Sequence, residues 1–184
     1  MQSAAECRLT NPVILDVGPG GMSRIGRWLH PIGPGGGWNG VERFRCKAAR
    51  LADNIARSNP FGRVSCPEVE EVYQTSMALN PRKIVVIDLQ QKVLDAGRRF
   101  ARLLEREELF EFRQLDLVNS PIGLSADIVI CYSVIGRASD RAAALGNICS
   151  AVRPGGLFSF GEEKALPGFV QLSPSLFRKN EAGK

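Results

Sequence analysis

The chain has 184 residues, of which 44% are hydrophobic, so it is long and apolar enough for one domain with a core of its own. Its formal net charge of +5 permits an acidic small molecule or a nucleic acid as a ligand and requires neither. The sequence has no apolar run near ~20 residues and no signal-peptide pattern in residues 1–12, which argues against a membrane or secreted protein. Five scattered cysteines without a Cys-x-x-Cys pair, and a single histidine, predict neither a disulfide framework nor a metal site, so we expect a cytoplasmic location.

The first predicted element is a strand at residues 12–17. Its unbroken apolar run is typical of a strand that is buried on both faces. The strand contains Asp16 near its end, and Gly18, Gly20 and Gly21 follow in a tight turn. Glycines allow the backbone to turn sharply and to approach a ligand with no side chain in the way. The pattern therefore predicts a ligand site where this strand ends.

An insertion follows at about residues 30–80, where a single crossover helix needs far fewer residues. It opens with a second glycine-rich loop, HPIGPGGGWNG, at residues 30–40. The spacing of apolar residues after this loop predicts two helices, the second of which ends near Leu79. We expect residues 30–66 to lie over the carboxyl edge of the sheet as a lid or a substrate wall.

The rest of the chain alternates predicted strands with predicted helices. The strands are expected at residues 83–88, 109–116, 126–133 and 157–162, and the helices at residues 91–106 and from a cap at Ser139 or Asp140 to Val152. Such alternation is typical of a parallel sheet with right-handed crossovers. We therefore predict an α/β fold in one domain over residues 1–184. It is a doubly wound, mostly parallel, Rossmann-like sheet with a helical insertion after the first strand and a shortened C-terminus.

The segment after the fifth predicted strand is short. About 22 residues remain after residue 162, and we expect them to form one strand at most. The apolar edge of the fifth strand then needs a cover, because an open edge pairs readily with other chains. We expect a homodimer that buries either the fifth-strand edge or the C-terminal tail at residues 168–177.

Four short motifs, taken in order, resemble a known family. They are Asp-x-Gly-x-Gly after the first strand, an acid at the end of the second, QLD at the end of the third and PGG before the fifth. This ordered set resembles the class I S-adenosylmethionine-dependent methyltransferases, in particular the small-molecule branch typified by the ubiquinone and menaquinone C-methyltransferases. The glycine turn alone also fits a dinucleotide site. In a dinucleotide motif, however, the acid of the second strand follows the glycines by about twenty residues, whereas Asp88 follows them by about seventy.

The resemblance implies S-adenosylmethionine as the cofactor and assigns residues to its methionine and ribose parts. Asp16 and the backbone of Gly18 would hold the methionine end, within the turn that Gly20 and Gly21 complete. Asp88 would accept both ribose hydroxyls, since a carboxylate has two acceptor oxygens.

The resemblance also assigns residues to the adenine. Leu89 would pack on the ring, Asp116 would accept from its amino group, and Leu117 would offer its backbone amide. A strand-end aspartate can instead cap the turn or helix that follows it, and this alternative applies to Asp16, Asp88 and Asp116 alike.

The end of the fourth strand would line the methyl-transfer site. The resemblance places Cys131 against the cofactor, and Tyr132 and Ser133 against the substrate. A general base is needed only where the acceptor must lose a proton first, and the candidates for that role are Tyr132 and the loop residue His30.

Trp28 and Trp38 flank the second glycine-rich loop and either shape a substrate pocket or pack the insertion. We expect a small-molecule substrate, with neither a nucleic acid nor a membrane as a partner. Two alternatives stay open: an RNA or protein methyltransferase, favoured only by the net charge, and a non-catalytic cofactor-binding or partner subunit with a degenerate methyltransferase fold, favoured by the short C-terminus.

Overall fold

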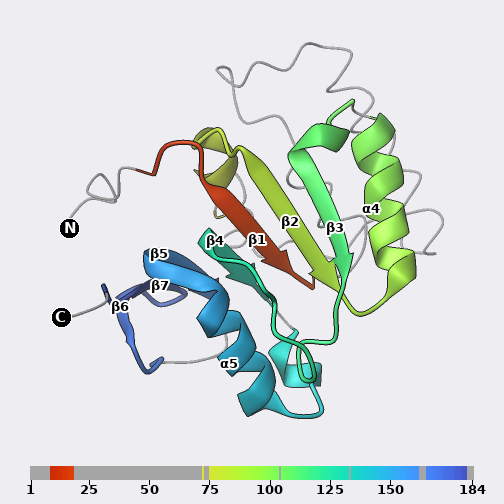
Figure 1. Ribbon diagram of the computed structural model, residues 1–184. Coiled ribbons are helices and arrows are strands. Elements are labelled where there is room, and N and C mark those ends of the chain that lie inside the picture. Colours follow the sequence, from red (N-terminus) through yellow and green to blue (C-terminus); the bar gives the residue numbers. More distant parts are fainter. Residues whose placement is uncertain are drawn as a thin grey trace.

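The computed structural model describes residues 9–18, 72, 75–103, 105–132, 134–161 and 165–181. These residues contain a seven-stranded sheet in the order β3-β2-β1-β4-β5-β7-β6 (Figure 1). The strands are β1 (Val13–Val17), β2 (Lys83–Asp88), β3 (Phe110–Gln114), β4 (Ala126–Cys131), β5 (Val152–Phe160), β6 (Phe169–Ser173) and β7 (Leu176–Lys179). Strands β1 to β5 pair in parallel, whereas β7 is antiparallel to both of its neighbours. The predicted mostly parallel sheet is confirmed.

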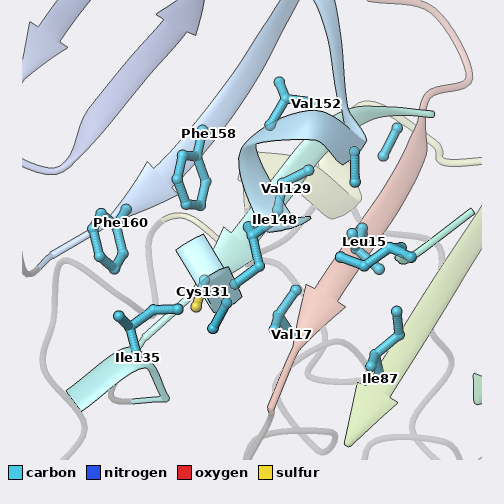
Figure 2. Packing of buried hydrophobic residues seen from close by; sticks show 14 of the residues in the cluster. Leu15, Val17, Ile87, Val129, Cys131, Ile135, Ile148, Val152, Phe158 and Phe160 are labelled. Carbon is cyan, nitrogen blue, oxygen red and sulfur yellow. The ribbon is translucent and has the colours of Figure 1, made fainter. Parts of the chain in front are cut away.

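Helices cover both faces of this sheet. The helices with defined bounds are α4 (Gln91–Leu103) and α5 (Arg141–Ala151), and short 3-10 turns are found at η2 (Glu107–Leu109) and η3 (Ile135–Arg137). Leu94 of α4 packs in one core cluster with Ile14 of β1, whereas Ile148 of α5 packs in the other with Leu15 (Figure 2). Successive strand residues point to opposite faces, so the two helices lie on opposite sides and the sheet is doubly wound.

The local sequence explains where several elements begin. The run KIVVID forms β2 with the predicted bounds, and its four central residues are buried. Asp140 caps α5, because its side chain accepts a hydrogen bond of 3.0 Å from the backbone N–H of Ala143. Residues 75–78 are helical and lead toward β2, at the place where the second helix of the insertion was predicted to end. Of the predicted insertion, residues 30–71, 73 and 74 lie outside the described residues.

Strand β5 begins five residues earlier than predicted. The sequence RPGG suggested a helix stop and a turn before the strand, but β5 follows α5 directly from Val152. The register with β4 explains how. Ala126 pairs with Val152 and Ile128 pairs with Leu157, so the extra residues bulge out of the ladder between these two pairs. Gly155 lies within this bulge with a φ of +72°, which favours glycine.

The C-terminal segment forms two strands, so the expectation of one strand at most is wrong. Strands β6 and β7 have only 5 and 4 residues and are joined by a tight turn, which lets an antiparallel pair fit into this short segment. Phe177 of β7 pairs with Phe158 of β5, and both side chains are fully buried. The chain itself therefore covers the edge of β5, and a homodimer that uses this edge is ruled out. A homodimer through the tail stays a prediction.

No helix in the described ranges is long and apolar enough to cross a membrane. Within the same ranges, no group of three or more histidine, cysteine, aspartate or glutamate side chains is arranged to hold a metal ion.

Candidate functional site

The strand order reverses at β1, and this switch point lies at the carboxyl edge of the sheet (Figure 1). From β1 the chain adds β2 and β3 on one side, and β4 and β5 on the other. Ligands of open parallel sheets bind at this kind of edge. Asp16 is the penultimate residue of β1, Asp88 ends β2, and Asp116 follows β3 by two residues. The fold thus brings the three predicted acids to one edge.

Gly18 shapes the turn at the end of β1. Its φ is +59°, in the left-handed region that favours glycine. Its backbone N–H donates a hydrogen bond of 2.7 Å to the carbonyl of Ile87 in β2. A Cβ at this position would overlap the side chain of Val134, which follows β4. Only a glycine therefore lets the turn lie this close to the chain that leaves β4. Gly20 and Gly21 lie outside the described residues.

Asp16 is buried, with 1% of its surface exposed. It alternates with Leu15 and Val17, so its side chain lies on the same face of β1 as Ile14. A buried carboxylate needs hydrogen bonds or a paired charge. This position fits a residue that supports the glycine turn from within the fold, and its contact with the methionine end of a cofactor stays a prediction.

Asp88 is half-buried at the end of β2, where its two carboxylate oxygens differ. Oδ1 accepts a hydrogen bond of 2.8 Å from the backbone N–H of Gln90, just before α4 begins. Oδ2 accepts none from any residue that the structure describes. The capping interpretation therefore holds for one oxygen, and the other has capacity for a ligand hydroxyl.

Leu89 is an exposed aliphatic side chain beside this carboxylate. It is 61% exposed, the largest value given for a large hydrophobic residue in the described ranges. Its backbone carbonyl accepts a hydrogen bond of 2.9 Å from Nε2 of Gln114, the last residue of β3. The neighbouring residues are bonded as well, because the backbone N–H of Leu115 donates a hydrogen bond of 3.2 Å to the carbonyl of Asp88. The backbone that carries Leu89 is thus held in place, and its side chain is open to a flat apolar ligand.

Asp116 uses both carboxylate oxygens to build the turn after β3. Oδ1 accepts from the backbone N–H of Val118 at 2.9 Å, and Oδ2 accepts from the side chain of Asn119 at 2.8 Å. The Val118 bond, followed by the Asn119 bond, holds the pKa of Asp116 below its ordinary value. The capping interpretation therefore describes this residue well. The turn presents Leu117, whose N–H makes no hydrogen bond with the described part of the chain.

The two residues at the end of β4 point to opposite faces of the sheet. The side chain of Cys131 is fully buried in the core cluster beneath α5, close to Ile135 (Figure 2). Its predicted contact with a cofactor would therefore have to be made by its backbone, and it stays a prediction. The hydroxyl of Tyr132 is hydrogen bonded to the Oγ of Ser159, a buried residue of β5. Ser133, His30, Trp28 and Trp38 lie outside the described residues.

The sequence analysis missed Gln114 and Asn147. Gln114 belongs to the quoted QLD stretch, but its bond to Leu89 follows from the pairing of Asp88 with Gln114 across β2 and β3. Asn147 of α5 donates from Nδ2 to the carbonyl of Leu117 at 2.8 Å, across 30 residues of sequence. Neither contact has a signal in the local sequence, because both depend on how separate elements pack.

Comparisons with known proteins give a family and a set of distant structural similarities. A family model described as a methyltransferase domain matches residues 46–158, which is more than half of the chain. No curated protein sequence matches.

The solved structures that are similar to the chain include the following three, all of them distant in sequence. YcgJ of Bacillus subtilis has 15% identity and a TM-score of 0.46, covering 85% of this chain and 47% of that chain. A methyltransferase from Geobacter sulfurreducens in complex with S-adenosyl-L-homocysteine has 16% identity and a TM-score of 0.45, and the match covers 90% of this chain and 46% of that chain. YjhP of E. coli has 16% identity and a TM-score of 0.42, and the match covers 82% of this chain and 42% of that chain. The chain spans less than half the length of these three proteins.

Proposed function

Because the chain belongs to the methyltransferase domain family, we propose that it transfers a methyl group from S-adenosylmethionine to a small-molecule acceptor. One observation carries the proposal: at the end of β2, next to the switch point, a half-buried carboxylate with an unused oxygen lies beside an exposed leucine whose backbone is fixed. This pair suits a ribose next to a flat apolar base. The resemblance to the ubiquinone and menaquinone C-methyltransferases supports a small organic acceptor of that type.

The residues of the edge fit S-adenosylmethionine. Oδ2 of Asp88 would accept from the ribose, and the side chain of Leu89 would pack on the adenine. The N–H of Leu117 would donate to a ring nitrogen, with Asp116 holding the turn that carries it. The Gly18 turn, close to Val134, would leave the backbone open to the methionine end.

Catalysis in this proposal is mainly positioning. The cofactor supplies an electrophilic methyl group on its sulfonium. The protein would hold the acceptor in line with it and exclude water. Tyr132 directly follows β4, and its hydroxyl is hydrogen bonded to Ser159. We assign Tyr132 to the lining of the site, and it stays a candidate base together with His30. We assign the substrate wall to Ser133, Trp28 and Trp38. A cytoplasmic location is part of the same proposal.

Calorimetric titration tests the proposal first. We expect S-adenosylhomocysteine to bind and NAD not to bind. Transfer of labelled methyl to members of a metabolite mixture then tests the reaction. Binding without transfer to any acceptor supports the non-catalytic subunit instead, and methylation of RNA with a steep salt dependence of RNA affinity supports the RNA enzyme. Binding of NAD without binding of S-adenosylhomocysteine contradicts the proposal.

A further inference from the structure

Two side-chain amides each hold one backbone carbonyl at the corner where β2 and β3 end. Gln114 Nε2 donates to the carbonyl of Leu89 at 2.9 Å, and Asn147 Nδ2 donates to the carbonyl of Leu117 at 2.8 Å. They come from different elements, β3 and α5. Their acceptors belong to the two residues that follow the strand-end acids Asp88 and Asp116 directly.

The two fixed residues present complementary groups. Leu89 offers an exposed apolar side chain, and Leu117 offers a backbone N–H that makes no hydrogen bond with the described residues. A flat aromatic heterocycle with a ring nitrogen uses both, since it needs an apolar surface for its face and a donor for its edge. Each loop is thus held in the form that such a ring would need.

We propose that Gln114 and Asn147 are positioning residues that form the adenine slot before the cofactor binds. The inference deepens the proposed function and rests on it. A slot that is already ordered binds more tightly, because less conformational freedom is lost on binding. Gln114 is itself exposed, and so is its hydrogen bond to Leu89. Its main effect is therefore on the geometry of Leu89 and only slightly on the stability of the fold.

The test measures binding of 5′-methylthioadenosine, a neutral probe with the adenosine part and no amino-acid end. Gln114→Met removes the donor and keeps the length of the side chain, and Gln114→Lys restores a donor. The matched control is Gln171→Met, which alters an exposed glutamine on β6, the strand at the opposite end of the sheet. Calorimetry gives the dissociation constants, and thermal unfolding gives Tm for each variant.

We expect Gln114→Met to weaken binding of the probe by about fivefold, the effect of one hydrogen bond. Gln114→Lys and Gln171→Met should bind within about twofold of the unchanged protein on the same scale, and Tm should stay the same for all three. Asn147→Ala should weaken binding in the same direction. Its Tm reports any loss of packing at this half-buried position.

Two results overturn the inference alone: binding by Gln114→Met as tight as in the unchanged protein, or equal losses for Gln114→Met and Gln114→Lys. Unchanged binding by Asn147→Ala removes Asn147 from the slot. A different result distinguishes the failure of the proposed function. If the unchanged protein binds neither 5′-methylthioadenosine nor S-adenosylhomocysteine, the cofactor assignment itself is wrong.

Discussion

Asp88 and Asp116 occupy similar positions in the sequence but use their carboxylates differently. Asp88 commits one oxygen to the N–H of Gln90, whereas Asp116 commits one oxygen to Val118 and the other to Asn119. The same residue type at a strand end therefore keeps one oxygen available in the first case, where we propose that it binds the ribose, and forms the turn with both oxygens in the second. Only the pattern of backbone and side-chain donors in each following turn decides which.

Asp88→Asn tests the ligand role of the second oxygen. Asparagine keeps one acceptor oxygen for the N–H of Gln90, and its amide group replaces the oxygen that we assign to the ribose. We expect binding of S-adenosylhomocysteine to weaken by ~1.5–3 kcal/mol, the scale for hydrogen bonds to a charged group. Calorimetry measures this loss. Glu108→Gln is the matched control, since it removes an acidic charge from η2, at the opposite end of β3. Equal losses in both variants would point to a general charge effect.

The pH dependence of stability tests the turn-forming role of Asp116. Its pKa in the folded chain is lowered from 3.8, chiefly by the Val118 N–H and then by the Asn119 side chain. A lowered folded pKa means that the stabilisation is complete above 3.8, and is lost as the pH falls below this value through the folded pKa. Thermal unfolding of Asp116→Asn against pH should therefore show a shallower decline on the acid side than the unchanged protein does. Parallel declines would contradict this role.

At the scale of elements, Lys179 joins the C-terminal hairpin to α5. Its Nζ donates to the carbonyls of Cys149 and Val152, at 2.8 and 2.7 Å. These carbonyls lie at the C-terminal end of α5, where a positive charge is favourable. The hairpin is thus fixed to the helix by this lysine and to β5 by the buried ring of Phe177.

Lys179→Met should lower the free energy of unfolding by ~1–3 kcal/mol, since it removes two charged hydrogen bonds from half-buried carbonyls. Urea denaturation measures this change. The neighbouring residue gives the control, because Arg178 is exposed and Arg178→Met also removes one positive charge from β7. Equal losses of unfolding free energy in the two variants would show that the stabilisation comes from the positive charge and not from the contact with α5.

The sequence predicted the elements that carry a strong local pattern and missed those that depend on pairing. The unbroken run from Lys83 to Asp88 is enough to define β2, and Asp140 is recognisable as a helix cap. The early start of β5 depends on a bulge opposite β4, and the hairpin depends on a turn between two very short strands. At the candidate site, the position of the three acids at one edge of the sheet was predictable from their order along the chain, whereas their binding role stays a prediction. The amides of Gln114 and Asn147 were not, since their partners are distant in sequence.

At the scale of the whole molecule, β6 is the last strand of the described sheet on the C-terminal side. Four of its five residues are exposed, and its sequence FVQLS contains no charge. Val170 and Leu172 are each 48% exposed. Proteins usually protect an outer strand with charges, bulges or a cover, and β6 has one irregularity in its pairing with β7, between Gln171 and Ser173. An uncharged outer strand with two exposed aliphatic side chains is therefore suited to antiparallel pairing with the same strand of a second copy.

We expect this pairing to give a homodimer through the tail, now that β7 covers the edge of β5. Sedimentation at micromolar concentration should show a species of twice the 20.1 kDa chain mass. Val170→Lys combined with Leu172→Lys should yield the monomer, because the two copies would then bring like charges together at the two-fold axis. Leu89→Lys is the control, since it adds a charge at an exposed leucine on the other half of the sheet and should leave the dimer intact. A monomer in the unchanged protein, or a dimer that persists after the double substitution, would contradict a homodimer formed through the tail.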